Sequence, residues 1–297
     1  MGRKSLRWDN FWLADASRGA LQSRGASAYG GDVENAGSNP RSSGSLHRFA
    51  NPGRFLRLTD NWLPWLSWAA LIVLGTGIVW GLWLAPRDWQ QGETVRIMFV
   101  HVPMAWLAMG GYMGLAILSL MSLIWRHPLA DLTARELSPI GAAVTALCLL
   151  TGSLWGKPMW GTWWVWDARL TSVLVLFFLW LGHAALVRAF DDPERGARMG
   201  AILALVGVVN VPIVKFSVDW WNTLHQPASV TRLDAPGMHV DILYPLLWCT
   251  LGFTLAFMAV TLAATRAAVM ERRVRALQMA AARRADAPGG AMRSVEA

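Results

Sequence analysis

The sequence predicts an all-α integral membrane protein with six transmembrane helices, and three observations support that fold class. The chain has 297 residues, of which 54% are hydrophobic and only 15% are charged, and its mean hydropathy is +0.33. Its apolar residues gather in six long segments, and its Lys and Arg residues gather in alternate loops between them. This composition is typical of a membrane protein and argues against a large soluble domain.

Each of the six apolar segments is long enough to cross a bilayer, which takes roughly 20 apolar residues in a helix. The third and the fifth segments are the shortest. The predicted spans are residues 62–85, 103–125, 138–155, 170–190, 199–218 and 242–264.

The distribution of Lys and Arg predicts how these spans are oriented. The regions before the first span and after the second, fourth and sixth hold 21 of the 27 basic residues, whereas the other three loops hold 2 each. Because Lys and Arg concentrate on the cytoplasmic side of membrane proteins, both termini are predicted to be cytoplasmic. The loops around residues 86–102, 155–169 and 219–241 are then predicted to face outward.

Two tails flank the predicted membrane domain, which covers residues 59–265. Residues 1–58 are rich in Gly, Ser, Asn and Arg without apolar periodicity, so we expect a disordered cytoplasmic tail. Residues 266–297 include the basic, Ala-rich stretch ERRVRALQMAAARR, which we expect to continue the sixth helix into the cytoplasm.

The loop between the third and fourth spans holds an unusual concentration of tryptophan. Residues 155–167, called the Trp segment below, read WGKPMWGTWWVWD. An aromatic belt at the membrane surface would need only about one or two Trp in each span. We therefore expect a platform for a large flat ligand, with Gly156 and Gly161 allowing close backbone approach. Its candidate binding residues are Trp155, Trp160, Gly161, Trp163, Trp164, Trp166 and Asp167.

If the Trp segment is helical, at about 100° per residue, Trp166 points away from one shared face. That face would consist of Trp160, Trp163, Trp164 and Asp167. A carboxylate within an aromatic face needs a partner, because an unpaired buried charge is costly. Arg169 and Lys157 are local candidates for that partner, and a residue of another loop is the alternative.

Two histidines in the outward loops are candidate metal ligands. His101 lies in RIMFVHVPMAW and His225 lies in DWWNTLHQPAS, each two residues before a proline. Both have apolar or aromatic neighbours, and both are predicted on the same side of the membrane as the Trp segment. Imidazole is a common axial ligand of haem iron. Two such histidines converging on an aromatic surface would suit a bis-histidine haem site.

The other four histidines are weaker candidates. His239 is the second choice as a ligand, because its neighbours Pro-Gly-Met offer no aromatic walls. His47 and His127 are expected to be ordinary solvated residues. His183 lies within the fourth span on the side away from the Trp segment, so we expect a hydrogen bond between helices there, with a functional role as the alternative.

A bound haem would also bring two propionates, and the bidentate fork of Arg suits carboxylates. Among the outward cations, Arg96 and Arg169 are candidate propionate anchors.

Several function classes lack their motifs. There is no phosphate-binding G-x-x-x-x-G-K-[ST], no H-E-x-x-H and no Ser nucleophile elbow. Cys148 and Cys249 form neither C-x-x-C nor C-x-x-C-H, which argues against a thiol oxidoreductase and against covalently attached haem. The spans hold few charges besides Lys215 near one end, so we expect the membrane interior to be mainly a scaffold.

Three stretches of the chain resemble a known family. They are APRDWQQGETVRIMFVHVP, SPIGAAVTALCLLTGSLWGKPMWGTWWVWDARLTS and GVVNVPIVKFSVDWWNTLHQP, and the resemblance covers nearly all of residues 60–270. They resemble the CcmC family of haem exporter proteins, within the haem-handling membrane proteins that share a Trp-rich WWD domain. Haem lyase subunits share the W-G-x-x-W-x-W-D core but tend to continue with Pro and an acidic residue, whereas ARLTS follows here.

The resemblance implies that His101 and His225 are the axial ligands of a non-covalently bound haem b. It implies that the platform consists of Trp160, Gly161, Trp163, Trp164, Trp166 and Asp167. It also implies a protein of the bacterial inner membrane that works on the periplasmic side, with the haem chaperone CcmE, CcmD, and the ABC transporter subunits CcmA and CcmB as partners. The chain departs from the family in its long N-terminal tail and its extended basic C-terminus.

The leading hypothesis is a haem-delivering protein of cytochrome c maturation that is not itself an enzyme. A haem lyase that attaches haem to apocytochrome c is the first rival, and the residues after Asp167 argue against it. A haem permease is the second rival, and it would need ligands along a path through the membrane, where only His183 could serve.

Overall fold

The computed structural model describes residues 51–221, 223–225 and 237–285, and in these residues it is entirely helical apart from loops. No strand forms in the described residues, and an isolated bridge joins Asp88 and Gly92. The helices are α2 (Pro52–Val79), α3 (Met98–Trp125), α4 (Pro128–Trp160), α5 (Ala168–Leu186), α6 (Pro193–Gly207), α7 (Asn210–Trp220) and α8 (Val240–Ala285). A π-helical turn (Trp80–Leu84) extends α2, and a 3₁₀ helix (Glu93–Ile97) precedes α3.

Six helical segments of the described chain are long and apolar enough to cross a membrane, which confirms the six predicted spans. They are Pro52–Leu84, Glu93–Trp125, Pro128–Trp160, Ala168–Leu186, Pro193–Trp220 and Val240–Arg283.

Contacts divide the chain into two units. Asp60–Thr265 is one unit, and it holds the functional site and the spans except for the first turns of α2 and the last turns of α8. The other unit consists of Met1–Thr59 and Arg266–Ala297, of which the structure describes the first turns of α2 and the last turns of α8. The helix that begins at Pro52 includes residues 52–58, whereas the sequence predicts a disordered tail up to residue 58; residues 1–50 lie outside the described part.

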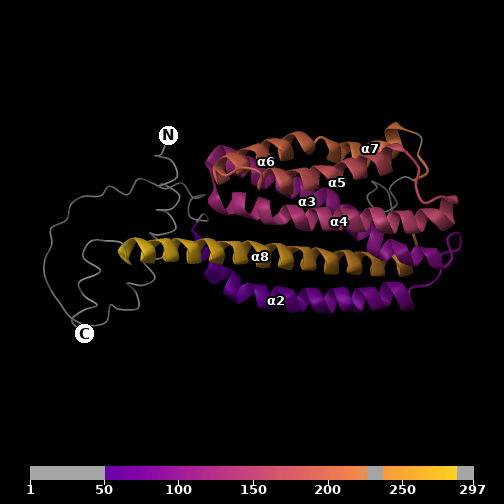
Figure 1. Ribbon diagram of the computed structural model, residues 1–297. Helices are drawn as coiled ribbons and strands as arrows, with labels where there is room; N and C mark the ends of the chain where they lie inside the picture. Colours follow the sequence, from indigo (N-terminus) through magenta and orange to yellow (C-terminus); the bar gives the residue numbers. More distant parts are fainter. Residues whose placement is uncertain (1–50, 222, 226–236, 286–297) are drawn as a thin grey trace. The chain divides into compact units, whose positions relative to one another are not determined.

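The core of the Asp60–Thr265 unit lies between α3, α4, α5 and α6, which run alongside one another (Figure 1). The Trp180 side chain is fully buried against α4, where a Cβ added to Gly141 would lie 2.4 Å from its ring. It meets Tyr112 edge to face, with 5.0 Å between ring centroids. A side chain at position 141 would collide with this ring, so glycine allows the close approach of α5 to α4.

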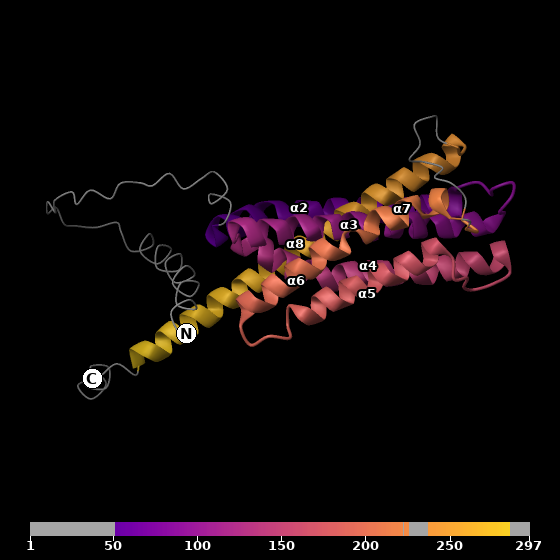
Figure 2. The ribbon, with the colours of Figure 1, turned by 90° about the horizontal axis from the view of Figure 1, so that it is seen from above.

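Two further contacts position α8 and the second half of the fifth span. Figure 2 shows α8 running obliquely to α2 and α3, and a Cβ on Gly252 would lie 2.6 Å from the Cα of Leu74. The fifth span breaks after Gly207 and resumes at Asn210, whose Nδ2 donates to the carbonyl of Ser172 at 2.9 Å. This hydrogen bond connects the start of α7 to α5.

The third span covers residues 128–160 and is longer than the predicted 138–155. Because its helix begins at residue 128, the prediction that His127 is an ordinary solvated residue is wrong. Pro128 occupies the first helical position, and His127 Nδ1 accepts a hydrogen bond from the Ala130 amide at 3.2 Å. His127 is therefore a buried helix cap rather than a solvated residue. His183 behaves as expected, since its Nδ1 lies 2.5 Å from Ser138 Oγ on the neighbouring helix.

Candidate functional site

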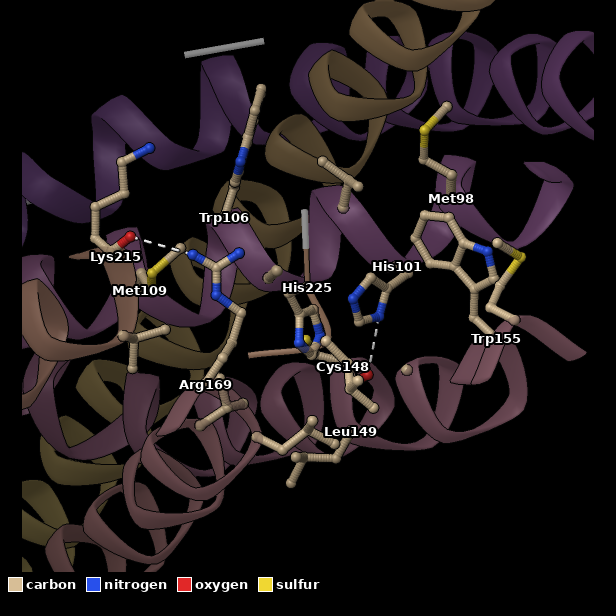
Figure 3. Close-up of a pocket in the computed structure, with 18 of the residues that line it drawn as sticks. Met98, His101, Trp106, Met109, Cys148, Leu149, Trp155, Arg169, Lys215 and His225 are labelled. Atoms are coloured by element: carbon tan, nitrogen blue, oxygen red, sulfur yellow. Dashed lines mark hydrogen bonds between the residues drawn. The ribbon is translucent and has the colours of Figure 1, made fainter. Parts of the chain in front are cut away.

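A pocket of about 300 Å³ lies where α3, α4, α5, α7 and the segment 223–225 meet, and the start of α8 also contributes to it. Figure 3 shows His101 and His225 in its middle, Trp155 and Met98 toward one end, and Arg169, Lys215 and Trp106 toward the other. The structure thus brings together residues that are far apart in the sequence. The predicted site residues that line this pocket are His101, His225, Trp155, Trp160 and Arg169.

His101 lies in the first turn of α3, and α4 fixes the orientation of its ring. Its Nδ1 is 3.1 Å from the carbonyl oxygen of Cys148 and 3.1 Å from Thr151 Oγ1. A carbonyl oxygen only accepts hydrogen bonds, so Nδ1 carries the hydrogen. The lone pair of the neutral ring is then on Nε2, and this is the tautomer that a metal ligand bound through Nε2 requires.

His225 follows α7, and a carboxylate fixes its ring. Its Nδ1 lies 3.2 Å from Asp167 Oδ2, and the Asp167 side chain is only 5% exposed. Burial lowers the pKa of His225 below its ordinary value, while the negative charge of Asp167 opposes that shift. A neutral ring that donates from Nδ1 to the carboxylate again has its lone pair on Nε2.

Asp167 serves two partners at once. Its Oδ1 accepts the Leu170 amide at 2.7 Å, which makes it the N-cap of α5, while Oδ2 bonds His225. Of the partners expected for this carboxylate, the residue from another loop is the one that forms the hydrogen bond. Lys157 instead donates to the carbonyl of Gly161 at 3.0 Å.

One tryptophan packs against each histidine. Trp155 meets His101 with 5.6 Å between ring centroids, and Trp160 meets His225 at 4.8 Å. Trp155 Nε1 also donates to Gln91 Oε1 at 3.0 Å, which fixes its ring. Both tryptophans lie on α4, and both line the pocket.

The Trp segment is not one helix, so the predicted common face of Trp160, Trp163, Trp164 and Asp167 is wrong. The helix α4 ends at Trp160, because Gly161 adopts a left-handed conformation with φ of 76° and its amide bonds the Lys157 carbonyl. Residues 164–167 are not helical, and α5 begins only after Asp167.

This break divides the predicted platform. Trp163 and Trp166 are 54% and 75% exposed, and neither lines the pocket. Trp164 packs edge to face on Trp166, at 5.5 Å between centroids. Gly156 is the glycine that allows close approach, since an added Cβ would lie 3.1 Å from the Trp160 ring, whereas Gly161 has no close neighbour and is required for its positive φ.

The two candidate propionate anchors lie in different places. Arg169 lines the pocket and is held by α7, with Nε 3.2 Å from Ser217 Oγ and Nη2 3.2 Å from the Lys215 carbonyl. Arg96 bonds the Glu93 carboxylate and donates from Nη1 to the Leu82 carbonyl at 2.5 Å, and it does not line the pocket.

Sequence reasoning missed several lining residues on α3 and α7. Trp106 lies eight residues after Met98, and Met109 lies eight residues after His101; this spacing is that of one helical face and could have identified both. Lys215 also lines the pocket, and a cation within a span was the available signal. His239 lies outside the lining, with its side chain 71% exposed beside Asp241.

The fold and the pocket together define a class: a helical membrane protein with six spans and a pocket between its helices in which two histidines face one cavity. The chain belongs to the CcmC family, described as heme exporter protein C, whose model matches residues 45–280. This confirms the resemblance found in the sequence, and the protein is a multi-pass protein of the inner membrane.

Curated relatives agree with the family model over most of their length. The chain is 58% identical over 240 residues to the heme exporter protein C of Bradyrhizobium diazoefficiens, covering 81% of this chain and 91% of the relative. It is 46% identical over 232 residues to that of Escherichia coli K12, covering 77% and 93%. It is 42% identical over 234 residues to that of Paracoccus denitrificans, covering 78% and 97%.

Proposed function

We propose that this chain holds haem b without a covalent link on the periplasmic face of the inner membrane and delivers it to the haem chaperone CcmE during maturation of c-type cytochromes. Family membership supports a haem-handling role. The observation that carries the proposal is that His101 and His225 line one pocket with both Nδ1 atoms hydrogen-bonded to the protein. Both Nε2 atoms are thereby suited to an iron atom.

In this proposal His101 and His225 are the two axial ligands, and their hydrogen-bond partners hold the rings in place. Partners behind a ligating histidine set its tautomer and raise its basicity. The aromatic rings of Trp155 and Trp160 supply flat apolar walls for the macrocycle, since such contacts hold a planar ligand without a covalent bond. The exposed Trp163 and Trp166 then lie at the rim rather than against the haem.

The excess of Lys and Arg in alternate loops supports a periplasmic position for the pocket. We further propose CcmD and the ABC transporter subunits CcmA and CcmB as partners, with the ATPase weakening axial ligation so that CcmE can take the haem. A permease receives less support, because His183, the intramembrane histidine of the described spans outside the pocket, bonds Ser138.

The proposal is tested by the absorption spectrum of the purified full-length protein. We expect a low-spin haem spectrum that is lost or altered in His101→Ala and in His225→Ala. His239→Ala is the matched control, because this histidine is exposed outside the pocket lining, and it should retain the wild-type spectrum. An unchanged spectrum with full haem content in either pocket variant would exclude ligation by this pair.

The delivery step needs a second measurement. Purified haem-loaded protein mixed with CcmE, CcmD, CcmA, CcmB and ATP should transfer haem to CcmE, and the two pocket variants should not. Transfer to an apocytochrome in the absence of CcmE would instead support the haem lyase alternative.

A further inference from the structure

The charged side chains that line the described pocket are both cations, and both lie at the same end. Arg169 comes from α5 and Lys215 from α7, while no carboxylate belongs to the lining. Figure 3 shows these two residues beside Trp106 and Met109, with the histidines between them and Trp155. The pocket is therefore polarised along its length, with a positive end and an apolar end.

The arginine of this pair is held in place before any ligand binds. Its Nε and Nη2 are bonded to Ser217 Oγ and to the Lys215 carbonyl, each at 3.2 Å, and Ser217 is fully buried. A guanidinium held on one edge presents its remaining N–H groups in a fixed direction, which favours binding of a carboxylate. The same contacts fix the distance between the Arg169 side chain and the Lys215 main chain.

Lys215 lies within the span Pro193–Trp220, in a region where a cation is costly. Such residues usually face a protein cavity and contribute to a functional site, and Lys215 does face the pocket. Arg96, the other anchor expected from the sequence, is engaged with Glu93 and the Leu82 carbonyl outside the lining. The second positive charge at the pocket is therefore that of Lys215.

We infer that Lys215 and Arg169 together receive the two carboxylates of a tetrapyrrole, and that Lys215 thereby determines both ligand specificity and ligand orientation. This inference rests on the proposed function. The carboxylate edge of the macrocycle lies toward α5 and α7. The opposite edge lies toward Gln91, Trp155 and Met159, so it is this edge that a haem-accepting protein would meet at the outer end of α4.

The test compares haem b with its dimethyl ester, which lacks both negative charges but keeps the iron and the ring. Each is titrated into the full-length, haem-free protein, and binding is followed by Soret absorbance. We expect the wild type to bind haem b at least about tenfold more tightly than the ester, because hydrogen bonds to charged groups are the stronger ones. In Lys215→Met, haem b binding should weaken by roughly tenfold while ester binding stays at its wild-type level.

Two further variants separate charge from general damage. Lys215→Arg keeps the charge and should retain most of the preference for haem b. Lys157→Met makes the same chemical change outside the pocket lining and should leave both affinities unchanged.

Each alternative result has a distinct meaning. Equal binding of haem b and ester by the wild type would overturn the inference while leaving the proposed function intact. An equal loss of both ligands in Lys215→Met would also overturn it, because the residue would then act through the fold. Failure of the wild type to bind either ligand would refute the proposed function and this inference with it.

Discussion

The two walls of the pocket hold a histidine in different ways. On one wall, His101 lies in a helix, and its Nδ1 bonds the neutral carbonyl of Cys148 and the hydroxyl of Thr151. On the other wall, His225 lies in a loop, and its Nδ1 bonds the carboxylate of Asp167. A charged acceptor forms a stronger bond than a neutral one. The wall with the less regular backbone therefore has the stronger side-chain support, and the helical wall relies on its backbone.

The largest expected effect comes from removing the charge on the loop wall. Asp167→Asn keeps an N-cap for α5, because Asn caps helices well, but it replaces the carboxylate that holds His225. Loss of a partner behind a metal ligand typically lowers metal affinity by about 10- to 100-fold. We expect haem affinity, measured by Soret titration, to fall by that factor with little change in the melting temperature. A matching loss of thermal stability would mean that Asp167 acts mainly as a helix cap.

The helical wall is tested through the space beside His101. A Cβ on Gly152 would lie 3.0 Å from His101 Cε1, so Gly152→Ala should push the ring from its position. Forcing a side chain off its rotamer costs about 0.5–1.5 kcal/mol, which corresponds to an affinity loss of up to roughly tenfold. The haem absorption bands should shift as well. Gly114→Ala is the control, since nothing lies within 4 Å of its added Cβ, and a similar shift there would rule out this explanation.

A smaller effect is expected from the hydroxyl on the same wall. Thr151→Val removes one acceptor from His101 but leaves the Cys148 carbonyl, so the loss should be about 0.5–1 kcal/mol, or roughly threefold in haem affinity. Thr145→Val makes the same change six residues earlier on α4, where the hydroxyl bonds the Gly141 carbonyl. If both variants lose the same affinity, Thr151 does not act through His101.

The smallest expected effect is a change in how the stability of the haem-free protein depends on pH. Burial lowers the pKa of His225, so the folded state favours its neutral form. Above about pH 6.5, the ordinary pKa of histidine, the ring is neutral in the unfolded chain as well, so the lowered pKa does not reduce the stability of the fold. Below that pH the unfolded chain takes up the proton first, and stability is lost until the lower folded-state pKa is reached. Asp167 raises this pKa, so Asp167→Asn should lower it further and extend the loss to lower pH. Melting temperatures measured from pH 8 to 5 in both proteins check the direction.

Much of the fold and part of the site can be predicted from the sequence, for physical reasons that differ between residues. Segment length and hydropathy were sufficient for the six spans, because a bilayer imposes both. The aromatic and apolar neighbours of His101 and His225 identified two residues that the fold brings into one pocket. A spacing of eight residues after His101 would also have identified Met109 on the same helical face.

The rest depended on local backbone geometry. Helical phasing of the Trp segment assumes one continuous helix. Lys157 and Gly161 form a common helix end, in which a cation lies in the last turn and a glycine follows it. The pairing of Asp167 with His225 joins residues 58 positions apart, and helical phasing within one segment cannot find such a contact. The capping role of His127 depends on the helix beginning at Pro128, ten residues before the predicted start of the span at residue 138.

The two oxygens of Asp167 form hydrogen bonds to different parts of the molecule, and this limits how the segment that carries His225 can move. Oδ1 is fixed to the Leu170 amide at the start of α5, so the carboxylate cannot turn to follow His225. A displacement of the segment that carries His225 therefore breaks its bond to Oδ2 rather than stretching it across a range of positions. The start of α5 therefore determines where the His225 ring can be held.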